Sequence, residues 1–206
     1  IGLVASMADR VLVMYAGQII EEAPAKEIFR APRHPYTKAL LATVPSIYDG
    51  DDRELVSIPG IVPEGYDDIP GCRFADRCEY RRPECDKPQE NYSFGEKHRA
   101  KMCCYEGRGK VRMAQDKRNK VPLIEVENMK KYYPIKGGII THTTGYVKAV
   151  DGVSFSVMEG ETLGLVGESG CGKSTIGRQI VGLENPTEGK IYYDGKDLAA
   201  CNGPGK

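Results

Sequence analysis

The most constraining feature of this chain is a glycine-rich stretch at 167–174. It reads Gly-Glu-Ser-Gly-Cys-Gly-Lys-Ser and fits the pattern G-x-x-x-x-G-K-[ST] at every position. An apolar run at 162–166 predicts a buried strand before it, and a helix is predicted at 173–183 after it. Glycines let backbone N–H groups approach phosphate oxygens, and the helix N-terminus adds the positive end of its dipole. The pattern therefore predicts a nucleotide phosphate site in a strand–loop–helix unit.

Individual positions of this loop have expected roles. The Lys173 ammonium is expected to reach the β- and γ-phosphates, and the Ser174 hydroxyl to ligate Mg²⁺. A chance glycine-rich turn is the alternative, and the complete match in the right context argues against it. The predicted nucleotide-binding residues of the loop are Gly167, Glu168, Ser169, Gly170, Cys171, Gly172, Lys173, Ser174 and Thr175.

Composition excludes several classes of protein. The 206 residues carry 29 Lys and Arg against 29 Asp and Glu, which argues against a dedicated nucleic-acid binder, because such proteins are normally basic. With 28% charged and 40% hydrophobic residues, the chain is expected to be neither an acidic disordered tail nor a membrane protein. Residue 1 is Ile rather than Met, so we expect the sequence to begin inside a longer protein.

Apolar periodicity predicts further elements around this loop. They are a strand–turn–strand at 8–23, helices beginning at Pro24 and at Tyr36, and strands at 123–126, 147–157 and 189–193. Frequent Gly, Pro and Asp predict a loop-rich connection at 46–70, and the cysteine-rich stretch 71–105 is also expected to be irregular. The polar, basic stretch 107–121 is predicted to be a linker.

The seven cysteines are unevenly distributed along the chain. No secretory segment is recognised, so the expected compartment is reducing, where clustered cysteines more often bind metal than form disulfides. Cys72, Cys78, Cys85 and Cys103 supply four thiolates within 32 residues, enough for a tetrahedral zinc site or an iron–sulfur cluster. The spacing leaves this choice open, and free buried thiols are a further alternative.

Segments around the glycine-rich loop resemble the ATPase domains of ABC transporters. The similar stretches are AVDGVSF at 149–155, GETLGLV at 160–166, SGCGKST at 169–175 and PTEGKI at 186–191. The stretch KKYYPIKGG at 130–138 is similar more narrowly to the oligopeptide/dipeptide importer subgroup. In ABC ATPases an aromatic residue near this point stacks on adenine, and the resemblance assigns that role to Tyr133. The alternative is an ordinary strand tyrosine.

The first half of the chain resembles the end of another ATPase subunit of the same importer group. The similar stretches are ADRVLVMYAG at 8–17, HPYT at 34–37, IPG at 58–60 and GCRFADRC at 71–78. In family members this C-terminal extension holds a [4Fe–4S] cluster. The resemblance assigns its ligands to Cys72, Cys78, Cys85 and Cys103, with Cys104 as the alternative fourth ligand and zinc as the alternative metal.

The two resemblances together imply an α/β fold of incomplete P-loop NTPase domains, of the ABC ATPase type, flanking a small irregular four-cysteine domain. The expected divisions are an ATPase C-terminal end at 1–45, the cysteine-bearing extension at 46–107, a linker at 108–120 and the start of a second ATPase domain at 121–206. After the loop we find no Q-loop, signature motif, Walker B residue or switch histidine. This stretch is therefore expected to be inactive alone, and no catalytic residue is assigned.

The implied function is that of the ATP-binding component of an oligopeptide or dipeptide importer, in which the intact protein hydrolyses ATP to drive transport. The implied partners are transmembrane permease subunits, a second ATPase domain in a head-to-tail dimer and, indirectly, a peptide-binding protein, with no nucleic acid. The implied location is the cytoplasmic face of the cell membrane. The alternatives are an iron–sulfur redox or sensor module with a nucleotide site, and another P-loop enzyme such as a kinase or GTPase.

None of the three histidines has a convincing catalytic arrangement. His34 precedes a proline and is expected to be a turn residue. His98 lies near the cysteines in sequence and is expected on a surface loop, with a place behind the metal ligands as the alternative. His142 has no partner that the sequence identifies.

Overall fold

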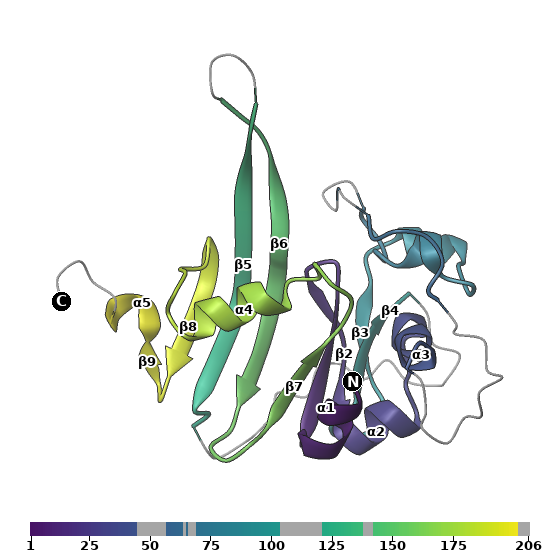
Figure 1. The fold of residues 1–206 in the computed structure, drawn as a ribbon, viewed down its shortest axis with the longest axis horizontal. Helices are drawn as coiled ribbons and strands as arrows, with labels where there is room; N and C mark the ends of the chain where they lie inside the picture. Colours follow the sequence, from purple (N-terminus) through teal and green to yellow (C-terminus); the bar gives the residue numbers. More distant parts are fainter. Residues whose placement is uncertain (45–56, 64, 66–68, 104–120, 138–141, 202–206) are drawn as a thin grey trace.

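The computed structural model describes residues 1–44, 57–63, 65, 69–103, 121–137 and 142–201 (Figure 1). The strands are β1 Arg10–Tyr15, β2 Gln18–Pro24, β3 Glu90–Ser93, β4 Arg99–Met102, β5 Ile124–Gly137, β6 His142–Val157, β7 Leu163–Val166, β8 Glu188–Tyr193 and β9 Lys196–Asp197. The helices are α1 Gly2–Met7, α2 Ala25–Arg30, α3 Pro35–Ala42, α4 Lys173–Ile180 and α5 Leu198–Cys201, with short 3-10 helices η1 Ala75–Arg77 and η2 Pro83–Asp86.

The described strands form two sheets. One has five strands in the order β3-β4-β2-β1-β7, and the other has four in the order β6-β5-β8-β9. Strand β1 pairs antiparallel with β2 and parallel with β7, from Arg10 opposite Leu163 to Val13 opposite Val166. Two segments about 150 residues apart in sequence therefore lie side by side in one sheet.

Strand β1 is buried on both faces, which explains its unbroken apolar sequence. Because side chains alternate along a strand, Val11 and Val13 pack into one core with α2 and α3, while Leu12 and Met14 pack into a second core. The second core also contains side chains from β5, β6, α4 and β8. Strand β1 thus joins the two cores of the molecule.

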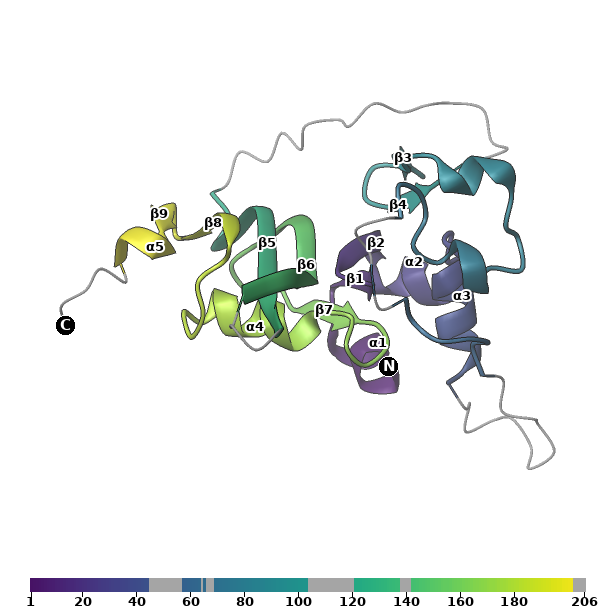
Figure 2. The same cartoon turned by 90° about the horizontal axis from the view of Figure 1, so that it is seen from above.

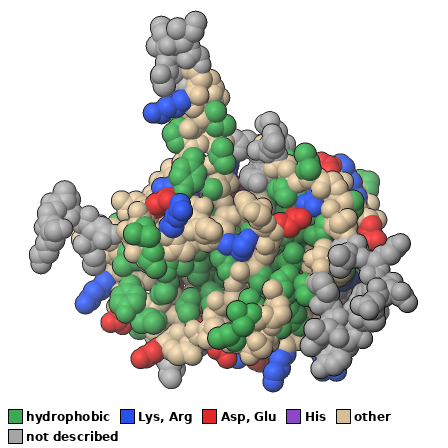
Figure 3. Space-filling model, viewed as in Figure 1, with side chains coloured by type: hydrophobic (Ala, Val, Ile, Leu, Met, Phe, Trp, Pro, Cys, Tyr) green, Lys and Arg blue, Asp and Glu red, His purple; other side chains and the backbone are tan. Residues whose placement is uncertain are grey.

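The hairpin of β5 and β6 projects from the body as a long arm (Figure 1). Helix α4 lies along one face of the sheet that contains this hairpin, as the view from above also shows (Figure 2). Hydrophobic side chains continue up the arm (Figure 3), where Ile135, Tyr146 and Val147 are each about half exposed. The body of the hairpin, by contrast, buries Val126 and Phe155 against α4 and β1.

Most of the predicted elements are confirmed, with β1 and β2 at 10–24 against the predicted 8–23, α2 after Pro24 and α3 near Tyr36. Strands β5 and β6 are longer than expected, because pairing along the arm extends them beyond their buried ends. The expectation of irregular structure throughout 71–105 is wrong for β3 and β4. These are short polar strands without an apolar period, and β4 pairs with β2, which joins the cysteine-bearing stretch to the main sheet.

Helix α1 has no counterpart among the predicted elements. The proposed linker at 108–120 and most of the connection at 46–70 lie outside the described residues. In the part of the chain that the structure describes, no helix combines the length and apolar character needed to cross a membrane.

Candidate nucleotide site and cysteine pocket

The glycine-rich loop connects β7 to α4, as the sequence predicts. Two of its glycines have close backbone neighbours. A Cβ atom at Gly167 would lie 2.2 Å from the Met14 carbonyl oxygen, and one at Gly172 would lie 2.3 Å from the Ala149 carbonyl oxygen. Gly172, with φ of +107°, also provides the left-handed turn into α4. The loop therefore packs against β1 and β6, where any side chain at these positions would clash.

Lys173, the first residue of α4, folds back over the loop. Its Nζ atom donates hydrogen bonds to the carbonyl oxygens of Gly167 at 2.9 Å and Glu168 at 2.7 Å. The ammonium is therefore held above the loop, and a phosphate oxygen could take the place of a carbonyl acceptor. Next to it, the Ser174 side chain is exposed in the first turn of α4, the position expected for a magnesium ligand.

Cys171 contributes to the loop through both its thiol, whose Sγ accepts from Lys173 Nζ at 3.5 Å, and its backbone. Its side chain is 1% exposed and belongs to the core beneath the loop, where burial raises the pKa of the thiol. Its carbonyl oxygen accepts a hydrogen bond from the Gly17 N–H, in the turn between β1 and β2. The β1–β2 turn thus supports the loop from below.

Tyr132 and Tyr133 lie next to each other on β5 and therefore point to opposite faces. The Tyr132 hydroxyl donates to Asp151 on β6, which ties it to the sheet. The Tyr133 side chain is more exposed, and its hydroxyl donates to Glu184, just beyond α4, at 2.6 Å. Burial and this carboxylate raise the pKa of Tyr133, and the Thr175 side chain is also within hydrogen-bonding reach. Tyr133 therefore lies alongside α4, within reach of its first turn at Thr175 and of Glu184 beyond its end.

Two residues that the sequence analysis did not single out contact the loop at Glu168. The Glu168 N–H donates to the Tyr36 hydroxyl at 2.8 Å, and the Glu168 carboxylate accepts two hydrogen bonds from Arg77 at 2.8 and 3.0 Å. This carboxylate is the main cause that raises the pKa of Arg77 above its ordinary value. No local sequence pattern indicates either contact, because the partners lie 132 and 91 positions away.

A second arginine of the cysteine-bearing stretch contacts β6 and the β1–β2 turn, both of which adjoin the glycine-rich loop. Arg73 forms an ion pair with Asp151 of β6 and donates to the Ala16 carbonyl oxygen in the β1–β2 turn. Asp151 also accepts from Tyr132, and both partners keep the pKa of its carboxyl low against the effect of burial. Two arginines therefore attach the segment that carries the cysteines to the glycine-rich loop (the phosphate loop, residues 167–174) and to the strands beside it.

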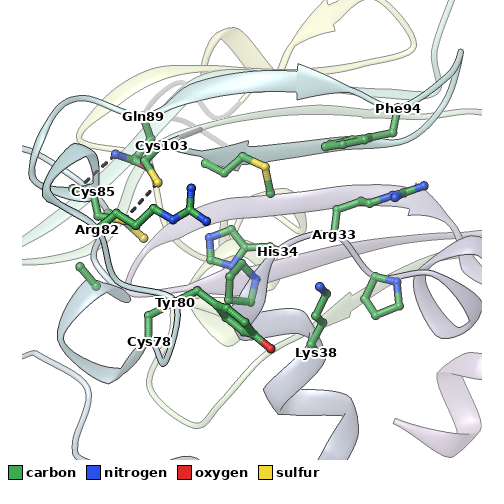
Figure 4. A pocket seen from close by; sticks show the side chains of 15 residues that line it. Arg33, His34, Lys38, Cys78, Tyr80, Arg82, Cys85, Gln89, Phe94 and Cys103 are labelled. Carbon is green, nitrogen blue, oxygen red and sulfur yellow. Dashed lines mark hydrogen bonds between the residues drawn. The ribbon is translucent and has the colours of Figure 1, made fainter. Parts of the chain in front are cut away.

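The four predicted cysteine ligands line one cavity (Figure 4). Cys72, Cys78, Cys85 and Cys103 surround a volume of about 310 Å³ together with basic side chains, including those of Arg33, Lys38 and Arg82. The Sγ atoms of Cys85 and Cys103 are 3.1 Å apart, and burial raises the pKa of the Cys72 thiol to about 11. Cys104 lies outside the described residues. The structure thus brings together four side chains that the sequence spreads over 32 positions.

This cavity is not a formed metal site. Among the residues that the structure describes, no group of three or more His, Cys, Asp or Glu side chains has a geometry that could hold a metal ion. A zinc ion would need its thiolates converged at ~2.3 Å from one point. The four thiols do match the donor set of an iron–sulfur cluster, whose several irons spread their ligands further apart. The metal centre therefore stays a prediction.

The two described histidine side chains are buried structural groups. His34 caps α3, where its Nδ1 accepts the Tyr36 N–H at 3.0 Å, and burial lowers its pKa to about 4. The expectation that His98 lies on a surface loop is wrong, because its side chain is 2% exposed. Its Nε2 is 2.6 Å from the buried Glu21 carboxylate, which needs such a partner. The side chain of His142 lies outside the described residues.

Two protein families match the chain in separate regions. Residues 20–85 match the family described as "Oligopeptide/dipeptide transporter, C-terminal region", and residues 150–204 match the family described as "ABC transporter". The first match includes Arg77 and three of the four cysteines, and the second includes the complete phosphate loop. Both descriptions refer to transporters, so they give no support to the alternative of a redox or sensor module.

Known proteins match almost the whole chain. It is 38% identical over 212 aligned residues to the "Oligopeptide transport ATP-binding protein OppD" of Mycobacterium tuberculosis, covering 97% of the chain and 35% of that protein. It is 34% identical over 205 residues to the "Glutathione import ATP-binding protein GsiA" of Escherichia coli K12, covering 100% of the chain and 27% of that protein. The chain thus spans about a third or less of these relatives. Over nearly its whole length it is similar to ATP-binding proteins of ABC transporters, in the oligopeptide/dipeptide group.

Proposed function

We propose that this chain is part of the ATP-binding component of a peptide importer and that residues 167–175 bind ATP with Mg²⁺. The observation that carries the proposal is the phosphate loop itself. Its glycines pack closely against Met14 and Ala149, and its lysine is aligned over the loop carbonyls. In this proposal the loop N–H groups and Lys173 hold the phosphates, and Ser174 ligates Mg²⁺. Mg²⁺ would neutralise part of the phosphate charge.

A peptide as cargo is inferred from the family match at residues 20–85 and from the relatives, whose names refer to oligopeptides and glutathione. In the intact protein, ATP binding would close this ATPase domain against a second one head to tail, and hydrolysis would reset the pair. The closure would act on transmembrane permease subunits at the cytoplasmic face of the membrane. A peptide-binding protein would deliver the cargo. The 206 residues alone would bind ATP without hydrolysing it.

The binding proposal is tested by titrating the 206-residue chain with a fluorescent ATP analogue in the presence of Mg²⁺. Lys173→Ala should weaken binding by about 10- to 150-fold, because it removes charge-assisted hydrogen bonds of about 1.5–3 kcal/mol. Lys196→Ala, in the exposed strand β9, is the matched control and should bind like the wild type. In the intact parent, Lys173→Ala should also abolish ATP-dependent peptide uptake. Unchanged binding and uptake would refute the assignment.

We assign the adenine-stacking role to Tyr133. Its position alongside α4, within reach of Thr175 in the first turn and exposed on β5, supports this assignment. Stacking needs only a flat aromatic face, so Tyr133→Phe should bind the ATP analogue like the wild type. Tyr133→Ala should weaken binding by about 5- to 150-fold, the effect of losing 1–3 kcal/mol of stacking. Equal affinities of the Phe and Ala variants would exclude the assignment.

A [4Fe–4S] cluster on Cys72, Cys78, Cys85 and Cys103 is the cofactor we propose for the cavity, with zinc as the alternative and Cys104 as the alternative fourth ligand. The shared cavity and the all-thiol donor set support it. The test is anaerobic purification followed by iron, sulfide and zinc analysis. About four irons and four sulfides per chain are expected. Stoichiometric zinc without sulfide would replace the cluster by a zinc site.

A further inference from the structure

Glu168, in the phosphate loop, makes hydrogen bonds through its carboxylate, its N–H and its carbonyl oxygen. Its carboxylate accepts a two-pronged hydrogen bond from Arg77, with Nη1–Oε2 at 2.8 Å and Nη2–Oε1 at 3.0 Å. Its N–H donates to the Tyr36 hydroxyl, and its carbonyl oxygen accepts from Lys173. Paired hydrogen bonds between a guanidinium and a carboxylate fix direction as well as distance. Glu168 is thereby fixed relative to α3 and η1.

Arg77 is itself rigidly placed. Its side chain is only 5% exposed, and its Nε donates to the Pro59 carbonyl oxygen at 2.7 Å. The guanidinium also lies 5.9 Å from the ring centres of both Tyr15 and Phe74. A planar group held on several sides loses little further freedom when it binds a carboxylate. Arg77 therefore transmits the position of its own segment to Glu168.

That segment is part of the wall of the cysteine cavity. Helix η1, which ends at Arg77, begins directly after a turn in which the Ala75 N–H donates to the Cys72 carbonyl oxygen at 3.0 Å. Cys78 follows Arg77, and its N–H donates back to the Ala75 carbonyl oxygen at 3.2 Å. Two cavity cysteines thus bracket the short helix that carries the arginine. A change at these cysteines that shifts η1 also shifts Arg77.

We propose that Arg77 is a positioning residue that couples the cysteine cavity to the phosphate loop and sets the affinity of the loop for ATP. Arg77 holds the first residues of the loop in place and neutralises a carboxylate that would otherwise repel bound phosphate. This inference rests on the proposed ATP site. Binding energies between linked sites are reciprocal, so ATP at the loop must in turn affect the cysteine-bearing segment.

A double-mutant cycle tests the first half of the proposal. The Kd of a fluorescent ATP analogue with Mg²⁺ is measured for Arg77→Gln, Glu168→Gln and the double variant, with the melting temperature recorded for each. Arg77→Gln should weaken binding about tenfold, because it leaves the Glu168 charge uncompensated. The double variant should recover most of that loss. A purely structural role of Arg77 predicts a lower melting temperature in both and no recovery, which would overturn the proposal.

Arg81→Gln is the matched control. Arg81 belongs to the same segment, but its side chain is 48% exposed and pairs with Asp76 and Asp86. Its replacement should leave the Kd unchanged. Wild-type affinity in Arg77→Gln, with binding still lost in Lys173→Ala, would refute the coupling and leave the ATP site intact. Absence of ATP binding by the wild-type chain would instead refute the proposed function.

The reciprocal effect is measured at Cys78, which is partly exposed. The rate of its alkylation by iodoacetamide is followed by mass spectrometry with and without Mg-ATP, on the apo chain. ATP should slow the reaction in the wild type by about fivefold or more, and the difference should shrink in Arg77→Gln. Identical rates with and without ATP in the wild type would refute the link to the cysteine cavity.

Discussion

Arg10→Met should lower the free energy of unfolding by about 3 kcal/mol. Arg10, the first residue of β1, pairs with Glu161 beyond β6 at 2.7 Å and with Glu22 on β2, and it donates to the Ser156 carbonyl oxygen. Its side chain is 10% exposed, that of Glu22 is 19% exposed and that of Glu161 is 14% exposed. Removing one partner from a buried ion pair costs about 3–5 kcal/mol. The lower end applies here because both carboxylates keep some contact with water.

The measurement is urea denaturation followed by circular dichroism and by tyrosine fluorescence, because the chain contains 12 Tyr and no Trp. Arg178→Met is the control. Its side chain is 63% exposed and its distance to Glu184 is 3.4 Å, so it should change stability by at most about 0.5 kcal/mol. Adding Glu22→Gln and Glu161→Gln to Arg10→Met should recover part of the loss, since no buried carboxylate is then left without a cation.

Strand β1 and the segment leading to the phosphate loop should unfold together. Arg10 contacts residues up to 151 positions away, so its loss should move a single transition observed by both probes. A loss below about 1 kcal/mol would refute the estimate of buried-pair energy. Two separate transitions, with only the first moved by Arg10→Met, would refute the view that both ends of the chain share one cooperative unit.

Three further changes have definite expected outcomes. Burial holds the pKa of His34 at about 4 against an ordinary 6.5, so the unfolded chain is protonated first as the pH falls. The free energy of unfolding should therefore fall by about 3 kcal/mol between pH 6.5 and 4. His34→Asn, which can still cap α3, should flatten that part of a plot of urea midpoint against pH. Gly172→Ala should abolish binding of the ATP analogue in fluorescence titrations, because its Cβ would lie 2.3 Å from the Ala149 carbonyl oxygen. Leu12→Ala, at a fully buried site, should cost 2–5 kcal/mol in urea denaturation.

Local features of the chain were predictable because their causes are local. The phosphate loop needs glycines where the backbone approaches its neighbours, and the residue types at Gly167 and Gly172 record that need directly. The apolar run of β1 likewise reflects burial of both of its faces. The bounds of α4 and β8 followed from short-range periodicity to within a few residues. Each of these signals lies within about ten positions of the element that it specifies.

Long-range contacts left no comparable signal. Nothing in the residues of β1 indicates that it pairs with β7, because any buried parallel strand would accept the same apolar sequence. The prediction that His98 lies on a surface loop is wrong for the same reason. Its burial depends on Glu21, a carboxylate 77 positions away that is itself 1% exposed. Polar residues inside a core become recognisable only when their partners are known.

The contact at Glu168 illustrates where such hidden coupling can arise. The loop pattern fixes the residues that approach phosphate and leaves position 168 open to any side chain. An open position within a constrained loop can therefore take a contact from another segment without displacing a phosphate ligand. Arg77 makes such a contact, and because the Glu168 carbonyl oxygen is also an acceptor for Lys173, a shift of Glu168 changes what the lysine binds. The variable position of the motif is thus the point at which the cysteine-bearing segment can act on the nucleotide site.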